Sequence, residues 1–294
     1  MAGGGQELKR RIRSVQNTQQ ITRAMKLVAG AKLRRAQERA ERTRGYFETI
    51  QDVMHRAAEA AGGVRARSPL LRPPTGEAVA YLVVTSDRGL AGPFNANLIR
   101  YASQLMREDE RKTAVFAVGR KARDAFRRRG VPSLGDFVGL GDEPHYYQAK
   151  AIADAVIAAY LDGEVGRVRL VYAQFINPMI QRPTVVDLLP MQEIPAVGGA
   201  REPRPDASSA LYLFEPDPET VLADLVPRYL EVLVYGALLE SKASEHGARM
   251  TAMDAATKNS EELLRTLTLT RNRLRQAAIT KEIAELVGGA AALE

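Results

Sequence analysis

The stretch SDRGLAGPFN, residues 86–95, combines charged, hydroxyl and glycine residues in the way that phosphate-binding loops do. It follows an apolar run that is typical of a buried strand. Such a loop requires the pattern G-x-x-x-x-G-K-[ST] or G-x-G-x-x-G, because its glycines let backbone N–H groups reach the phosphates. Gly89 and Gly92 complete neither pattern. We therefore interpret the stretch as a tight turn permitted by these glycines, in which Asn95 or Asn97 helps to start the next helix.

Other catalytic combinations are also missing. His55, His145 and His246 lie far apart and lack metal-ligand spacing, so we interpret each as a surface or interface residue. Asp87 and Arg88 could act as an acid and a substrate clamp, but a local ion pair or turn contact is the commoner role for such neighbours. The chain is therefore predicted to be non-catalytic, with no cofactor and no metal site.

Composition narrows the function classes. The 294 residues contain no cysteine, which excludes disulfides, thiolate zinc sites and cysteine nucleophiles. The formal charge of +7 predicts an acidic partner, which is nucleic acid, an anionic membrane surface or an acidic protein. The sequence has no run of about 18 apolar residues that could span a bilayer, so we expect any membrane association to go through partners.

Two long helices are predicted at the two ends of the chain. Residues 6–61 contain no proline and are rich in Ala, Arg, Gln and Glu, which predicts one helix on the order of 80 Å long. Residues 217–287 predict a second helix, with Asp217 as its N-cap. Pro227 is expected to kink this helix or to separate a short first helix from the main one.

Between the helices, residues 77–195 alternate short apolar runs with helix-like segments. AVAYLVVTS, TAVFAVG and RVRLVYAQF are typical of buried strands, and TVVDLLP of an edge strand. The fold class is therefore α/β, with a small Rossmann-like domain around a parallel or mixed sheet. Neither end helix can bury its apolar stripe against so small a domain. We expect the two to pair as one long, discontinuous, antiparallel coiled coil that projects from the domain.

Long segments of the chain resemble one family. They are ELKRRIRSVQNTQQITRAMKLVAGAKLRRAQ near the start, SDRGLAGPFNANL in the middle, and EHGARMTAMDAATKNSEELL followed by LTRNRLRQAAITKEIAELVGGAAAL near the end. These segments are similar to the gamma subunit of F-type ATP synthases of the bacterial type. The resemblance implies a central rotor shaft inside a ring of alpha and beta subunits. It further implies that the shaft stands on a membrane ring and couples its proton-driven rotation to ATP synthesis or hydrolysis at the beta subunits.

The same resemblance implies that the chain is a peripheral subunit at the cytoplasmic face of the cell membrane, with an epsilon subunit as a further partner. RQAAIT matches a segment that hydrogen-bonds a loop of the catalytic beta subunit. This match makes Arg275, Gln276 and Thr280 the first candidates for beta-subunit contact, with Arg249 and Glu282 beside them.

The resemblance also implies contacts at two other places. Arg23, Met25 and Lys26 lie in the matching part of the first helix, where basic residues would face acidic loops of the beta subunits. The segment YLFEP resembles the foot of the shaft, so Tyr212 and Glu215 are candidates for contact with the epsilon subunit or the membrane ring.

Two other function classes stay open on the residues alone. A nucleic-acid-binding coiled coil would explain the twelve basic residues between Lys9 and Arg44, although no base-stacking aromatic cluster accompanies them. A small nucleotide-binding enzyme with helical arms would explain the middle domain, although its glycine motif is incomplete.

Overall fold

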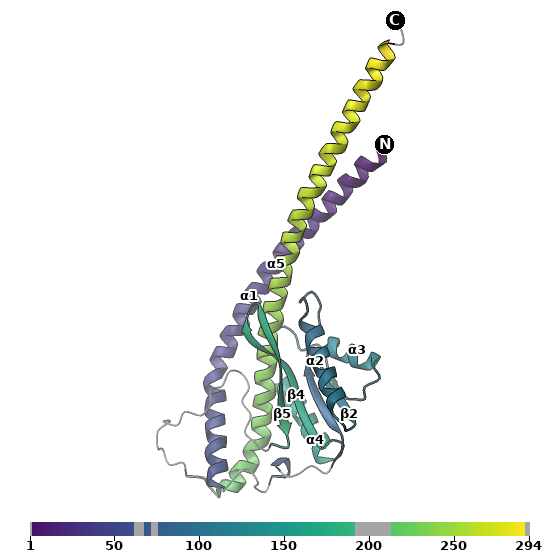
Figure 1. Cartoon of the computed structure of the whole chain (residues 1–294). Coiled ribbons are helices and arrows are strands. Elements are labelled where there is room, and N and C mark those ends of the chain that lie inside the picture. The colour runs from purple at the N-terminus through teal and green to yellow at the C-terminus, as the bar shows by residue number, and fades with distance from the viewer. Residues whose placement is uncertain (1, 62–67, 72–75, 192–212, 292–294) are drawn as a thin grey trace. The chain divides into compact units, whose positions relative to one another are not determined.

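The computed structural model describes residues 2–61, 68–71, 76–191 and 213–291. Its two long helices are α1, Ala2–Ala60, and α5, Pro218–Ala291, which run antiparallel (Figure 1). Asp217 caps α5 as expected, because its carboxylate accepts hydrogen bonds from the Thr220 backbone N–H at 2.9 Å and the Thr220 hydroxyl at 2.7 Å. The helix runs through Pro227 without ending, so the expectation of a separate short helix is wrong.

The chain divides into two compact units, which α1 and α5 both enter. One unit consists of residues 1–28 and 250–294, and the other of residues 29–249. We refer to them as the coiled-coil unit and the sheet unit.

In the coiled-coil unit, a thin seam joins α1 to α5. Ile12, Met253 and Leu267 are its buried apolar side chains, and Ser260 is buried with them. The Thr257 hydroxyl donates a hydrogen bond to the buried hydroxyl of Thr22 at 2.9 Å. The seam is therefore partly polar, because hydroxyl groups occupy positions that apolar residues fill in a standard coiled coil.

The sheet unit is built on a five-stranded sheet in the order β3-β2-β1-β4-β5. The strands are β1 (Val79–Val84), β2 (Thr113–Val118), β3 (Ser133–Phe137), β4 (Arg167–Asn177) and β5 (Ile180–Leu189). Neighbours from β3 to β4 are parallel, and β5 is antiparallel to β4. The sheet is thus mixed and of α/β class, with β5 as the expected edge strand. The strand β3 was not expected.

Helices cover both faces of this sheet (Figure 1). The shorter helices are α2 (Phe94–Glu108), α3 (Arg120–Arg128) and α4 (Tyr146–Leu161), with a 3-10 turn at Pro69–Leu71. Alternate strand residues point to opposite faces. One set packs with α2 and α3, and the other with α4 and with parts of α1 and α5. The α5 segment in this unit is therefore a core helix of the domain.

Candidate functional site

The loop after β1, residues 85–93, is a tight turn, and its positive-φ positions agree with the expectation at Gly92 but not at Gly89. Leu90 and Gly92 have φ values of 62° and 53°, while Gly89 is not among the residues with positive φ. A leucine in the left-handed region is uncommon and is held there only by its surroundings. Its side chain is 62% exposed. The loop therefore presents a leucine outward rather than a ring of glycine N–H groups.

Polar side chains hold this loop in place. The Asp87 carboxylate accepts hydrogen bonds from the backbone N–H groups of Arg120 and Gly139, each at 3.0 Å, so Asp87 makes a turn contact as expected. The Asn95 side chain accepts from the Ser86 backbone N–H at 3.0 Å. Asn95 therefore ties the loop together instead of capping α2, whose N-cap position is Pro93 without a side-chain hydrogen bond. That helix-start expectation was wrong for Asn95.

The helix α5 packs at the carboxyl ends of two central strands, which is where open α/β sheets bind ligands. That place is the crevice outside the carboxyl ends of adjacent strands that the chain leaves in opposite directions, here β1 and β4. Just beyond the last residue that β1 pairs with β4, the Ser241 hydroxyl accepts from the Ala173 N–H at 3.2 Å and the Ser244 hydroxyl donates to the Ala173 carbonyl at 3.0 Å. A Cβ at Gly247 would lie 3.2 Å from the Pro178 Cα, so only glycine fits this approach without a shift.

A buried ion cluster lies on the same segment of α5. Glu245 accepts a hydrogen bond from Lys242 at 2.9 Å and from Arg249 at 2.7 Å, and its side chain is 4% exposed. Arg249 also donates to the Gly89 carbonyl at 3.2 Å, which links α5 to the loop after β1. A carboxylate that accepts from two cations in a buried site offsets much of the cost of burying all three charges.

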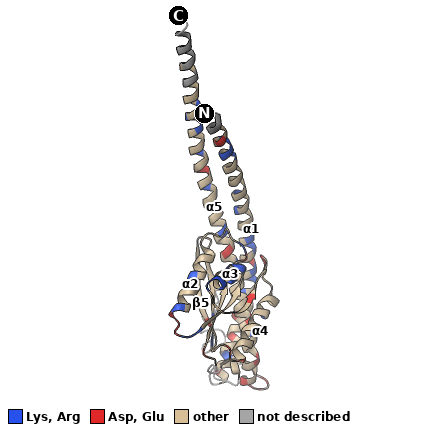
Figure 2. Ribbon diagram, turned by 90° about the vertical axis from the view of Figure 1, so that its right-hand side faces the viewer, with Lys and Arg blue, Asp and Glu red and all other residues tan. Residues whose placement is uncertain are grey.

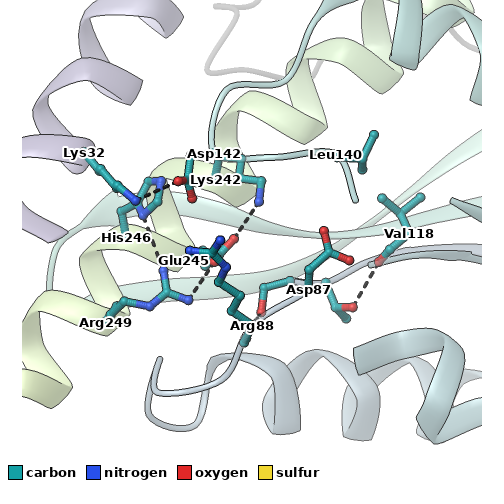
Figure 3. Close-up of polar contacts among 12 residues, drawn as sticks. Lys32, Asp87, Arg88, Val118, Leu140, Asp142, Lys242, Glu245, His246 and Arg249 are labelled. Atoms are coloured by element: carbon teal, nitrogen blue, oxygen red, sulfur yellow. Dashed lines mark hydrogen bonds and ion pairs between the residues drawn. The ribbon is translucent and has the colours of Figure 1, made fainter. Parts of the chain in front are cut away.

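His246 belongs to this cluster. Its side chain is 1% exposed, so the interpretation of His246 as a surface residue was wrong. Burial lowers its pKa, and the positive charges of Arg249 and Lys242 act in the same direction. Nearby, a hydrogen bond from Lys32 at 2.7 Å lowers the pKa of Asp142 (Figure 3). Lys32 on α1 and Asp142 on the loop after β3 thus meet beside the α5 cluster.

The candidate beta-contact residues on α5 belong to the coiled-coil unit. Arg275, Gln276 and Thr280 are all exposed. Gln276 and Thr280 are four residues apart and therefore share one face of the helix, while Arg275 lies about 100° around it. None of the three makes a hydrogen bond or ion pair to another described residue. Glu282 continues the same helix, but its side chain lies outside the described ones.

The candidates from the first helix lie in the same unit. Arg23 is exposed, whereas Met25 and Lys26 are half-buried. Lys26 donates to the Asp254 carboxylate of α5 at 2.6 Å, and the same carboxylate pairs with Lys258 at 2.9 Å. Figure 2 shows that Lys and Arg residues recur along α1. Lys26 therefore already has an intramolecular partner, while Arg23 makes no ion pair with a described residue and can contact another subunit.

Three further candidates remain. Arg249 belongs to the sheet unit, and its side chain is only 12% exposed because it is used in the Glu245 cluster. Tyr212 lies outside the described residues, and Glu215 is exposed just before α5. The structure thus groups Arg275, Gln276 and Thr280 on one stretch, and assigns Arg249 to an internal contact.

Sequence reasoning missed the Lys242, Glu245 and Asp142 cluster. A local signal existed, because Glu245 lies three residues after Lys242 and four before Arg249, which places all three on one helix face. Nothing local indicated that this face would be buried. Among the described residues, no cluster of three metal-ligating side chains was found, and none of the helices is long and apolar enough to cross a bilayer.

Comparisons with known proteins gave matches along nearly the whole chain. The family described as ATP synthase matches residues 4–293. The ATP synthase gamma chain of Pelotomaculum thermopropionicum is 51% identical over 288 residues, which is 98% of each chain. The ATP synthase gamma chain of Desulforamulus reducens is 52% identical over the same length and coverage.

Solved structures match as well. A chain of the central stalk and c-ring structure of the Tetrahymena thermophila mitochondrial ATP synthase aligns with a TM-score of 0.60 at 25% identity, covering 80% of this chain and 99% of that one. A chain of the Euglena gracilis mitochondrial ATP synthase in rotational state 3 aligns with a TM-score of 0.70 at 19% identity, covering 100% of this chain and 95% of that one.

Proposed function

The chain belongs to the ATP synthase gamma-chain family, and on that premise we propose that it is the central rotor shaft of an F-type ATP synthase. In this role it couples proton-driven rotation of a membrane ring to ATP synthesis or hydrolysis at the beta subunits. The observation that carries the proposal is the stretch of α5 at residues 269–280, whose side chains are exposed at nearly every position.

The uncovered segment is defined by the register of the two helices. Thr22 lies opposite Thr257, and the two helices rise equally per residue, so Ala2 is level with about residue 277 of α5. The helix continues to Ala291. Its apolar side chains at Leu274, Ile279 and Ile283 are 52%, 48% and 56% exposed. Exposed apolar side chains that recur along one helix favour burial against other subunits.

A shaft of this kind has a physical reason to be asymmetric. Chemically identical catalytic subunits differ in nucleotide affinity only if a partner contacts each of them differently. Two paired helices have no threefold symmetry, so a rotating pair would contact each subunit of a ring in turn. As α1 and α5 rotate, the nucleotide affinity of each catalytic subunit therefore changes in a repeating cycle.

The contacts with the beta subunits are assigned by motif and exposure. Arg275, Gln276 and Thr280 are exposed and have no partner among the described residues, which suits them to hydrogen-bond another subunit. An arginine can donate two parallel hydrogen bonds to one carboxylate, whereas Gln and Thr contribute single bonds. Arg23 supplies a further free charge on α1. Met25, Lys26, Arg249 and Glu282 join the same set by motif alone, and Lys26 and Arg249 also have partners in the chain.

The proposal extends to the other partners and to location. The alpha subunits complete the ring around the shaft, while the epsilon subunit and the membrane ring contact its foot at Tyr212 and Glu215. The chain itself is non-catalytic and binds no cofactor. It lies at the cytoplasmic face of the cell membrane as a peripheral subunit and reaches the membrane through these partners.

Reconstitution tests the proposal. The matching alpha and beta subunits are mixed with and without the full chain, and ATPase activity and complex size are measured. We expect the chain alone to be inactive and the mixture to form a stable, active complex. Changing Arg275 and Gln276 together to Ala should lower the activity of the complex several-fold, because up to three charge-assisted or neutral hydrogen bonds are lost.

The matched control changes Arg265 and Thr266 to Ala, an exposed neighbouring pair on the same helix. This pair should leave activity within about twofold of the unchanged complex. Failure of any complex to form would contradict the shaft function. A complex in which both double variants behave alike would instead contradict only the contact assignment.

A further inference from the structure

A cavity of about 140 Å³ lies within the sheet unit, where α1, α5 and the loop after β3 meet. It is separate from the exposed contact stretch on α5. Its polar lining comes from three elements: Lys32, Arg35 and Arg39 of α1, Asp142 and Glu143 of the loop, and Lys242 and His246 of α5. Figure 3 shows Lys32, Asp142, Lys242 and His246 gathered at this junction.

The charges around the cavity do not balance. Lys32 pairs with Asp142 at 2.7 Å and Arg39 with Glu143 at 2.6 Å. Lys242 shares Glu245 with Arg249, as described above. Arg35 makes no ion pair with a described residue. Five cationic side chains therefore meet three carboxylates, which leaves an excess of two positive charges.

The side chains around the cavity also carry more hydrogen-bond donors than acceptors. Lysine carries three donors and arginine five, and neither accepts. Lys242 is 8% exposed and makes one described hydrogen bond, to Glu245, which leaves two of its three donors without an acceptor among the described residues. Buried donors without acceptors are costly. The junction is therefore short of acceptors as well as of negative charge.

His246 adds one more donor. Its Nδ1 lies 3.4 Å from the Arg249 guanidinium. Because arginine only donates, this contact requires an acceptor lone pair on Nδ1. A neutral imidazole with a free Nδ1 carries its proton on Nε2. In that tautomer His246, which is among the residues that line the cavity, has one N–H donor to offer a ligand.

From this cavity we infer a binding site for a phosphate group, held by Arg35, Lys32, Lys242 and His246. A phosphate dianion supplies the two negative charges that the cluster lacks and several acceptor oxygens for the donors on α1 and α5. The volume holds one tetrahedral anion together with water, since one water takes about 30 Å³ in the liquid. Bound phosphate would join α1 and α5 at one point.

Two sources supply this chemistry, inorganic phosphate and the terminal phosphate of a nucleotide. The test titrates the full chain with inorganic phosphate, which replaces chloride so that the ionic strength stays constant. Binding is measured by the ³¹P NMR line width and by the heat of binding. Parallel titrations use ADP and an acidic peptide. We expect saturable binding of one phosphate per chain, with a dissociation constant on the order of 1 mM.

Arg35→Ala is the informative variant, because Arg35 is exposed and its loss should not unfold the chain. It should weaken phosphate binding about tenfold, through the loss of one unpaired cation at the site. Arg34→Ala is the matched control. Arg34 is the neighbouring arginine, its side chain is 84% exposed and pairs with Glu38, and it does not line the cavity. This variant should bind as the unchanged chain does.

Three results would overturn the inference. The first is no saturable binding of inorganic phosphate or ADP beyond that of chloride. The second is an equal loss of affinity in the Arg34 and Arg35 variants, because binding would then reflect the general charge of α1. The third is binding of an acidic peptide that depends on Arg35 without any binding of phosphate, which would make the cavity a carboxylate contact.

Binding of ADP but not of inorganic phosphate would support the site and identify the nucleotide as its source. None of these titrations uses alpha or beta subunits, so their outcome is distinct from that of the reconstitution.

Discussion

One helix, α5, passes through two opposite environments. Residues 229–248 are buried at nearly every position, whereas residues 261–280 are exposed at most. A helix that is buried all round needs apolar or paired residues on every face. The first stretch satisfies this need with aliphatic residues and the Glu245 ion cluster, and the second does not. Helical continuity therefore says nothing about which part of α5 stabilises the chain and which part is left for partners.

The largest expected difference comes from equal truncations in the two stretches. Leu238→Ala removes a side chain that is 2% exposed in the core and should lower the free energy of unfolding by about 2–5 kcal/mol. Leu274→Ala removes one that is 52% exposed and should change it by less than about 0.5 kcal/mol. Urea unfolding of the isolated full chain measures both. Similar losses for the two variants would remove the contrast between the stretches.

A medium effect concerns pH. Glu240 lies in the buried stretch, and its Oε2 has no hydrogen-bond partner among the described residues. Burial raises its pKa to about 7, opposed by the Phe175 N–H of β4 and by the charge of Arg44 on α1. A raised carboxyl pKa means that the folded chain binds the proton more tightly, so this contribution to stability falls as pH rises from about 4.5 to about 7. The full loss is roughly 3 kcal/mol.

The measurement is the unfolding free energy at pH 5 and pH 8, for the unchanged chain and for Glu240→Gln. His246 has a lowered pKa and contributes the opposite trend, so the difference between the two chains is the relevant quantity. Glu240→Gln cannot titrate and should lose less stability between the two pH values. Identical pH profiles would show that Glu240 is solvated.

The smallest effect on stability is expected for Asp254 in the coiled-coil unit. Hydrogen bonds from Lys26 and then Lys258 lower the pKa of Asp254, so its contribution is present above its ordinary pKa and is lost as pH falls through the lowered value. The pairs are part-exposed and therefore weak. Asp254→Asn should lower the melting temperature by less than about 2 °C, and the difference should shrink at about 1 M salt. A larger or salt-independent loss would indicate a buried ion pair.

Local patterns were sufficient for much of the fold. The β-branched runs of β1, β2, β4 and β5 identified four strands, and the Asp217 cap marked the start of α5. The strand β3 escaped because SLGDF has no β-branched residue and contains Gly135 and Asp136, which are depleted in strands. Its pairing with β2 is a tertiary effect that overrides propensity.

The ion cluster could not be predicted from local sequence, because its residues are far apart along the chain. Arg249 bonds Gly89, which is 160 residues away, and Lys32 bonds Asp142, which is 110 residues away. The packing of α5 and α1 in the sheet unit brings these groups together. The same docking explains why Arg249, on a motif that resembles a subunit contact, has its guanidinium largely engaged inside the chain.

The seating of α5 beside β4 also has a consequence for synthesis on the ribosome. Strand β5 ends at Leu189, but Tyr229, Leu230 and Leu238, which complete one sheet face, follow about forty residues later. Until they emerge, Leu82, Leu170 and Tyr172 lack part of their cover. A nascent chain stalled near residue 215 should therefore bind a chaperone such as trigger factor, and release should follow once α5 has left the exit tunnel.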